Sequence, residues 1–302
     1  MSASRAKARL APYAFIAPAV VLFTVLLAVP IGYAVYLSFR EVHISGLGLG
    51  PGSRSEGWAG LGNYTAALSD HELLSSTGRV LLYGILLVPT MLGLALLFAL
   101  LLDADRTRFR AFSRISIFLP YAIPGVIASL LWGFLYLPTI SPGYFILHKL
   151  GMNGPDLLSG NGMLVAIANI AVWGGTGFNM IVIYTSLRSI PAELYEAARL
   201  DGASELQIAL RIKVPMVLPS LVLTFFFSMI ATLQVFNEPT TLRPLTNGIS
   251  STWSPLMKVY RDAFTQGDIY SASATSVVIA VVTLAVSFGF LKLVGRRGLG
   301  EA

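Results

Sequence analysis

The sequence predicts an all-α membrane protein with six transmembrane helices and both termini on one side. Composition is the first reason, because 55% of the 302 residues are hydrophobic and only 12% are charged. Soluble domains usually carry about twice that charged fraction. The second reason is a mean hydropathy of +0.72. The third is that the apolar residues gather into six charge-free runs, each close to the roughly 20 residues that cross a bilayer.

The first run covers residues 10–39 and follows a short basic stretch. That order resembles a secretory signal peptide, whose apolar core is about 7 to 15 residues long. Because this run is about twice as long, we expect it to be retained as the first span.

Five further runs are expected to form the other spans: 80–102, 115–137, 162–187, 214–237 and 269–291. The Gly-rich connection at 43–64 is expected to be a loop, and it lacks the lysine of a phosphate-binding loop. We find neither an internal repeat nor a segment large enough for a separate soluble domain. Residues 1–302 are therefore treated as one transmembrane domain.

The distribution of Lys and Arg predicts the orientation of the spans, since basic residues concentrate on the cytoplasmic side. The two terminal segments and the connections after spans two and four hold 14 of them, against 7 in the remaining connections. We therefore expect both termini and segment 188–213 to face the cytoplasm, in a bacterial inner membrane.

Composition also excludes several classes of function. The chain has no Cys, which excludes a disulfide framework and a thiolate metal site. The formal charge of +6 comes from bases at the ends of apolar runs, so we do not expect nucleic-acid binding.

Two other classes of membrane protein were weighed. A secondary transporter should show charged residues within its spans and internal repeats, and neither is present. An intramembrane enzyme needs reactive side chains at depth, whereas His43, His71 and His148 all fall in outer loops. We therefore expect no catalytic residue and no metal site in this chain.

Segment 188–213 is charged, although it lies between two apolar runs. Ser189 and Pro191 indicate a helix start, as a cap and a first-turn proline. Asp201-Gly202 is expected to break that helix, because glycine readily takes the positive φ of a helix terminus.

A capping box at Ser204 and Gln207 then predicts a second, short helix, with an apolar stripe formed by Leu206, Ala209 and Leu210. The physics leaves two interpretations open. The segment either rests on anionic lipid as an interfacial helix or docks a cytoplasmic partner.

Residues 196–215, EAARLDGASELQIALRIKVP, resemble the EAA loop of permease subunits in binding-protein-dependent ABC importers. The family pattern is Glu-Ala-Ala, three residues, Gly, nine residues, Ile, one residue and Leu-Pro. The spacing matches throughout, with Val214 in place of the leucine. Further stretches at 60–68, 118–136, 173–204 and 233–242 resemble the maltose-type, carbohydrate-uptake branch.

The resemblance implies a type I ABC importer permease fold and a role in importing a sugar or oligosaccharide. It also implies the partners, namely a second permease, two cytoplasmic ATPase subunits that carry the ATP and Mg, and an extracellular or periplasmic solute-binding protein. By this resemblance, the residues that couple to the ATPase are Glu196, Ala197, Ala198, Asp201 and Gly202.

The fourth and fifth runs carry the candidate substrate pathway: Gly175, Thr176, Phe178, Asn179, Ser228, Thr232, Gln234 and Asn237. Hydroxyls, amides and an aromatic ring suit a neutral polyhydroxyl ligand. For the glycines, the alternatives are close helix packing and a locally unwound segment that lines a polar cavity. For the polar residues, the alternative is hydrogen bonding between spans. Glu238, at the end of the fifth run, either gates the pathway or anchors the helix.

Overall fold

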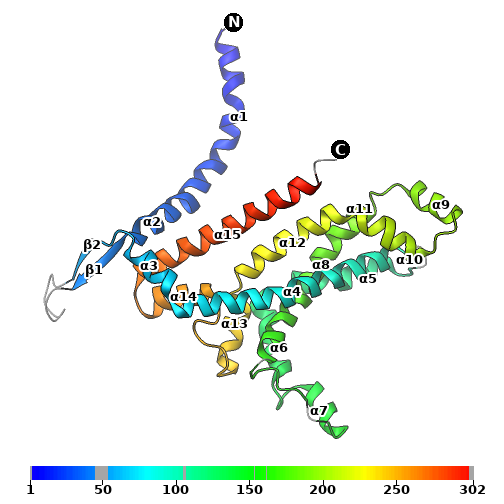
Figure 1. Cartoon of the computed structure of the whole chain (residues 1–302). Coiled ribbons are helices and arrows are strands. Elements are labelled where there is room, and N and C mark those ends of the chain that lie inside the picture. Colours follow the sequence, from blue (N-terminus) through cyan, green and yellow to red (C-terminus); the bar gives the residue numbers. More distant parts are fainter. Residues whose placement is uncertain (1, 45–53, 105–106, 153, 161, 299–302) are drawn as a thin grey trace. The chain divides into compact units, whose positions relative to one another are not determined.

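The structure, a computed structural model, describes residues 2–44, 54–104, 107–152, 154–160 and 162–298 (Figure 1). Helices dominate, which confirms the all-α prediction. The chain divides into two compact units, one formed by residues 1–71 and 258–281 and the other by residues 72–257 and 282–302.

Four helical stretches of the described residues are long and apolar enough to cross a membrane: Tyr13–Ser38, His71–Asp103, Gly162–Leu187 and Ile269–Phe290. Two further helix pairs are sharply bent, and the number reaches six if each bent pair is one span. The count of six and the side on which the termini lie stay predictions.

The first unit begins with helices α1 (Ser2–Phe23) and α2 (Val29–Ser38), which the π-helical turn Thr24–Ala28 joins without interruption. Strands β1 (Arg40–Ile44) and β2 (Arg54–Trp58) then pair antiparallel, with Arg40 opposite Trp58. Helix α3 (Gly62–Ser69) follows.

The expected loop at 43–64 is therefore wrong where the structure describes it; residues 45–53 lie outside the described residues. Backbone pairing holds the strands together, and the rings of Phe39 and Trp58 stack at 5.5 Å beside them. Asn63 donates from its amide to the carbonyls of Ser38 and Arg40, at 2.9 and 2.8 Å, and so ties α3 to the strand. The glycine content of residues 43–64 did not indicate this pairing, because most of strand β1 precedes the Gly-rich stretch.

The chain then forms α4 (His71–Asp103), α5 (Arg110–Phe118), the 3-10 turn Leu119–Ala122, α6 (Gly125–Tyr136), α7 (Pro142–Lys149), α8 (Gly162–Leu187), α9 (Ala192–Leu200) and α10 (Glu205–Ile208). After the π-helical turn Ala209–Lys213 come α11 (Val214–Met216), α12 (Leu218–Leu233), α13 (Asn237–Leu242), the 3-10 turn Arg243–Leu245, α14 (Pro255–Tyr260), the π-helical turn Arg261–Thr265 and α15 (Ile269–Gly298).

The third and fifth apolar runs are not straight helices, contrary to the simplest expectation. In the third run, α5 with its 3-10 turn meets α6 at 97°. Pro124 caps α6 with ψ of 133° and has no N–H to continue the preceding helix. In the fifth, the helix that ends at Met216 meets α12 at 63°, next to Pro215 and Pro219.

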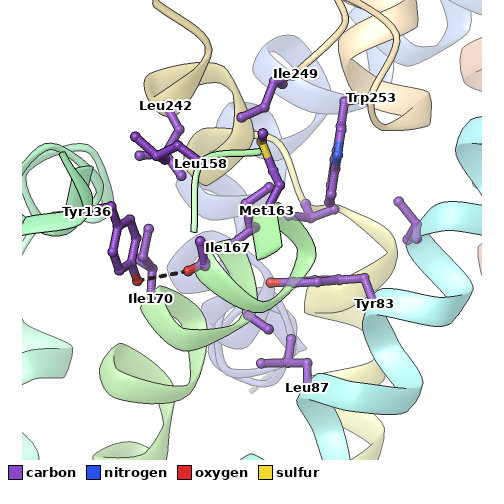
Figure 2. Close-up of a cluster of buried hydrophobic side chains, with 14 of the residues drawn as sticks. Tyr83, Leu87, Tyr136, Leu158, Met163, Ile167, Ile170, Leu242, Ile249 and Trp253 are labelled. Carbon is purple, nitrogen blue, oxygen red and sulfur yellow. Dashed lines mark hydrogen bonds between the residues drawn. The ribbon is translucent and has the colours of Figure 1, made fainter. Parts of the chain in front are cut away.

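Helix α8 is the centre of the second unit, since it packs against α5, α6, α12 and α13. One buried cluster surrounds its N-terminal half (Figure 2). Tyr136 of α6 and Tyr83 of α4 enter this cluster on opposite sides of α8, and the Tyr136 hydroxyl donates to the Ala166 carbonyl at 3.0 Å (Figure 2). The C-terminal half packs on α4 through Met180, Ile183 and Leu187. Helix α8 thus contributes to both buried clusters and ends at Leu187, directly before segment 188–213.

Candidate functional site: a cavity and a capped surface segment

A cavity of about 560 Å³ lies in the second unit, and residues of α4, α6, α8, α12 and α13 line it. Seven of the eight residues expected to form the substrate pathway line this cavity: Gly175, Phe178, Asn179, Ser228, Thr232, Gln234 and Asn237. Thr176 does not, because it lies on another face of α8, where its hydroxyl donates to the Val172 carbonyl at 2.6 Å. With the exception of Thr176, the expected pathway residues of the fourth and fifth apolar runs thus meet at one cavity.

Gly175 and Gly177 of α8 serve close packing, and the helix is not unwound at either residue. The helix runs without interruption from Gly162 to Leu187, so of the two alternatives the locally unwound segment is excluded. A Cβ at Gly177 would lie 2.7 Å from Phe118 Cα, and one at Gly175 would lie 2.5 Å from Met91 Sδ. Intrahelical hydrogen bonds outweigh the modest helix cost of glycine, and the missing side chains let α4 and α5 approach.

The polar side chains of the cavity do not bond between helices, which was the alternative explanation for them. Asn179 donates to the Gly175 carbonyl at 3.0 Å and Thr232 to the Ser228 carbonyl at 2.7 Å, both within one helix. Among the described residues, the side chains of Ser228, Gln234 and Asn237 have no hydrogen-bond partner. Their donors and acceptors are therefore available to a solute.

An aromatic pair stands at one wall of the cavity. The ring of Phe178 stacks on Tyr121 at 5.0 Å with an interplanar angle of 22°. Tyr121 covers one face of Phe178, so a sugar ring has access only to the remaining aromatic surface. Tyr121 follows Pro120 in the bent third run, and sequence reasoning missed it because the bend was not foreseen.

Helices α9 and α10 form the segment that resembles the EAA loop, and its turn has the expected geometry. Gly202 has φ of +81°. Its N–H donates to the Arg199 carbonyl at 3.0 Å, and the Ala203 N–H donates to the Ala198 carbonyl at 2.9 Å. This pair of bonds is the Schellman motif that closes a helix through a left-handed glycine.

The start of the second helix is confirmed as well. The Ser204 hydroxyl accepts from the Gln207 N–H at 3.3 Å, and the Gln207 amide oxygen accepts from the Ser204 N–H at 2.7 Å. Arg199 and Glu205 form a 2.8 Å ion pair from one helix to the next. The expected cap at Ser189 is wrong, because its hydroxyl donates back to the Ser186 carbonyl and Pro191 precedes α9 instead.

The exposed surface of the segment is partly apolar. Glu196, Ala197, Asp201 and Gly202 are exposed, and Ala198 is half-buried. Three leucines of the same segment are exposed by 58% or more: Leu200, Leu206 and Leu210. Leu206 and Leu210 of the expected stripe are thus largely uncovered by the described residues, whereas Ala209 is half-buried and Ile208 is fully buried.

A buried ion pair joins this segment to α4. Lys213 Nζ lies 2.5 Å from Asp103 Oδ2, and the side chains are 10% and 5% exposed. Arg188 lies 3.8 Å from the same carboxylate, and Lys213 Nζ lies 4.7 Å from the centre of the Tyr195 ring. In the sequence, Asp103 and Lys213 lie directly beside the apolar runs 80–102 and 214–237, and nothing local in the chain pairs two residues 110 positions apart.

Comparisons with known proteins cover nearly the whole chain. Residues 59–297 match the family described as binding-protein-dependent transport system inner membrane component. The sn-glycerol-3-phosphate transport system permease protein UgpA of Agrobacterium fabrum is 29% identical over 96% of each chain. The osmoprotective compounds uptake permease protein GgtC of Synechocystis is 32% identical, over 74% of this chain and 78% of its own.

A solved structure shares the fold. It is a chain of a bacterial ABC transporter involved in the import of the acidic polysaccharide alginate, and it superposes with a TM-score of 0.81 at 20% identity, over 98% of each chain.

Proposed function

The chain belongs to the inner membrane components of binding-protein-dependent transport systems, and we propose that it is the permease subunit of an ATP-driven importer for a sugar or oligosaccharide. In this proposal it forms half of the translocation pathway, and a second, homologous permease forms the other half. The observation that carries the proposal is the convergence of seven predicted pathway residues on one cavity, whose lining combines polar and apolar side chains.

The coupling role is assigned to Glu196, Ala197, Ala198, Asp201 and Gly202 on the capped segment. Its Schellman turn fixes the angle between α9 and α10, and its exposed leucines offer apolar area to a partner. Exposed apolar surface of this kind contacts either a protein or a membrane, and the resemblance of the segment to the EAA loop favours a protein partner. Two cytoplasmic ATPase subunits, which hold the ATP and Mg and carry out the hydrolysis, are the proposed partners, so this chain is not itself an enzyme.

The cargo is proposed from the chemistry of the cavity and from the relatives. Two relatives are named for sn-glycerol-3-phosphate and for osmoprotective compounds, and the transporter whose chain shares the fold is involved in the import of alginate. The free amides and hydroxyl of Gln234, Asn237 and Ser228 suit the hydroxyls of a carbohydrate. A solute-binding protein outside the membrane would deliver the cargo, as in a solved alginate complex with its periplasmic protein.

The experiment that tests this function removes one amide from the cavity. Gln234→Leu should lower carbohydrate uptake about tenfold, because one neutral hydrogen bond to the solute contributes about 1 kcal/mol and an unmatched hydroxyl adds a desolvation cost. Assembly with the ATPase should be unchanged. Gln266→Leu makes the same chemical change at an exposed site that does not line this cavity.

Uptake is measured in proteoliposomes that hold the complete importer. Normal uptake of every carbohydrate in Gln234→Leu, and in its combination with Ser228→Ala, would remove the basis for placing the pathway here.

A further inference from the structure

The cavity of the second unit holds one charged side chain, Glu238. None of the described residues that line it is Lys, Arg or His. The remaining polar lining consists of hydroxyl and amide side chains: Tyr83, Tyr121, Asn179, Ser228, Thr232, Gln234 and Asn237. The only charge that these lining side chains can present to a solute is therefore that of the Glu238 carboxylate.

Nothing in the described chain neutralises Glu238. It forms no ion pair with any Lys, Arg or His that the structure describes. Glu238 stands in the first turn of the short helix α13, and burial raises the pKa of its carboxyl above the ordinary value. Its carboxyl thus lines the cavity without a cationic partner among the described residues.

A site built in this way suits an uncharged solute. Proteins bind phosphates and carboxylates with Arg or Lys, often in bidentate geometry, and this cavity lining has neither. An unpaired acid repels a second negative charge, and the repulsion is strong where the dielectric constant is low. Unpaired charge against the wrong ligand is one of the two general sources of specificity. Carboxylate oxygens accept hydrogen bonds from neutral hydroxyls, so the same group attracts a polyol.

We infer that Glu238 makes this pathway select uncharged polyhydroxyl solutes and reject phosphorylated or acidic sugars. The inference rests on the function proposed above and narrows its cargo. It distinguishes this chain from relatives named for sn-glycerol-3-phosphate and from the importer of the acidic polysaccharide alginate.

The test uses the complete importer, reconstituted with its partner permease, ATPase subunits and binding protein in proteoliposomes. The neutral probes are maltose, cellobiose and trehalose, and the anionic probes are sn-glycerol-3-phosphate and an alginate disaccharide. The best-transported neutral sugar is then compared with its uronate, both at concentrations that saturate the binding protein.

The wild-type importer is expected to take up the neutral sugar at least about tenfold faster than the uronate. Glu238→Gln should reduce that ratio about tenfold, the effect of a like-charge repulsion that is removed at moderate distance. Because the readout is a ratio within one preparation, a lower yield of folded variant does not change it. Glu72→Gln, an exposed residue that does not line the cavity, should leave the ratio unchanged.

Two results would overturn the inference alone: wild-type uptake of an anionic probe as fast as of any neutral sugar, or an unchanged ratio in Glu238→Gln. If the wild-type importer transports none of the carbohydrates, the proposed function fails, and the inference fails with it.

Discussion

Removing the charge of Asp103 should weaken the attachment of segment 188–213 to helix α4. Asp103 is the last residue of α4, where the partial negative charge of the helix terminus disfavours an acid. Lys213, whose Nζ lies 2.5 Å from the Asp103 carboxylate and whose side chain is 10% exposed, offsets that cost. In Asp103→Asn the lysine keeps its charge in a buried place, with the Tyr195 ring as its nearest described aromatic partner.

The expected cost follows from that burial. Breaking a buried ion pair by removing one partner costs about 3–5 kcal/mol, and we expect the lower end because an amide oxygen still accepts from Lys213. Lys213→Met should cost less, since Arg188 remains 3.8 Å from the Asp103 carboxylate. With about 2 °C of melting temperature per kcal/mol for a chain of this size, Asp103→Asn should melt roughly 6 °C lower.

The assay is thermal unfolding of the purified complex, together with co-purification of the ATPase and uptake per ATP hydrolysed. The double variant Asp103→Asn/Lys213→Met should recover about 1 kcal/mol or more relative to the sum of the single changes, as for residues in direct contact. Glu193→Gln, an exposed acid of the same segment, is the matched control. A melting temperature within about 1 °C of wild type in Asp103→Asn, or strict additivity in the cycle, would refute the reasoning.

Three further predictions concern the turn, the packing of α8 and the orientation. Gly202→Val should cost at least about 1 kcal/mol through its φ of +81° and loosen the ATPase in co-purification, whereas Gly202→Asn, which tolerates that conformation, should bind nearly normally. Gly177→Ala should lower the melting temperature, since its Cβ would lie 2.7 Å from Phe118 Cα, while Gly174→Ala, with nothing within 4 Å, should raise it; equal shifts in both variants would contradict the packing argument. A reporter that functions only in the cytoplasm should be active when fused after Ala302, and activity of an exclusively periplasmic reporter there would reverse the orientation.

Local chemistry predicted the parts of this protein that depend on neighbouring residues. The charge-free run 162–187 became α8 with the same bounds, because apolar character and flanking polar residues define a helix along the chain. Gly202 took its left-handed conformation and Ser204 its capping box, because both devices act over a few residues. The resemblance to permeases with an EAA loop also rested on spacing, and the family match agrees with it.

Only the tertiary structure decided which residues meet across the fold. It brought Gln234 and Phe178 to one cavity, turned Thr176 away and added Tyr121 through a bend at Pro124 that hydropathy does not record. It also paired Asp103 with Lys213, 110 positions apart. Such contacts depend on the approach of whole helices, and that approach is set at positions such as Gly177, where a single added carbon would collide with another helix. Helix periodicity determines which side chains share a face, but packing determines what that face touches.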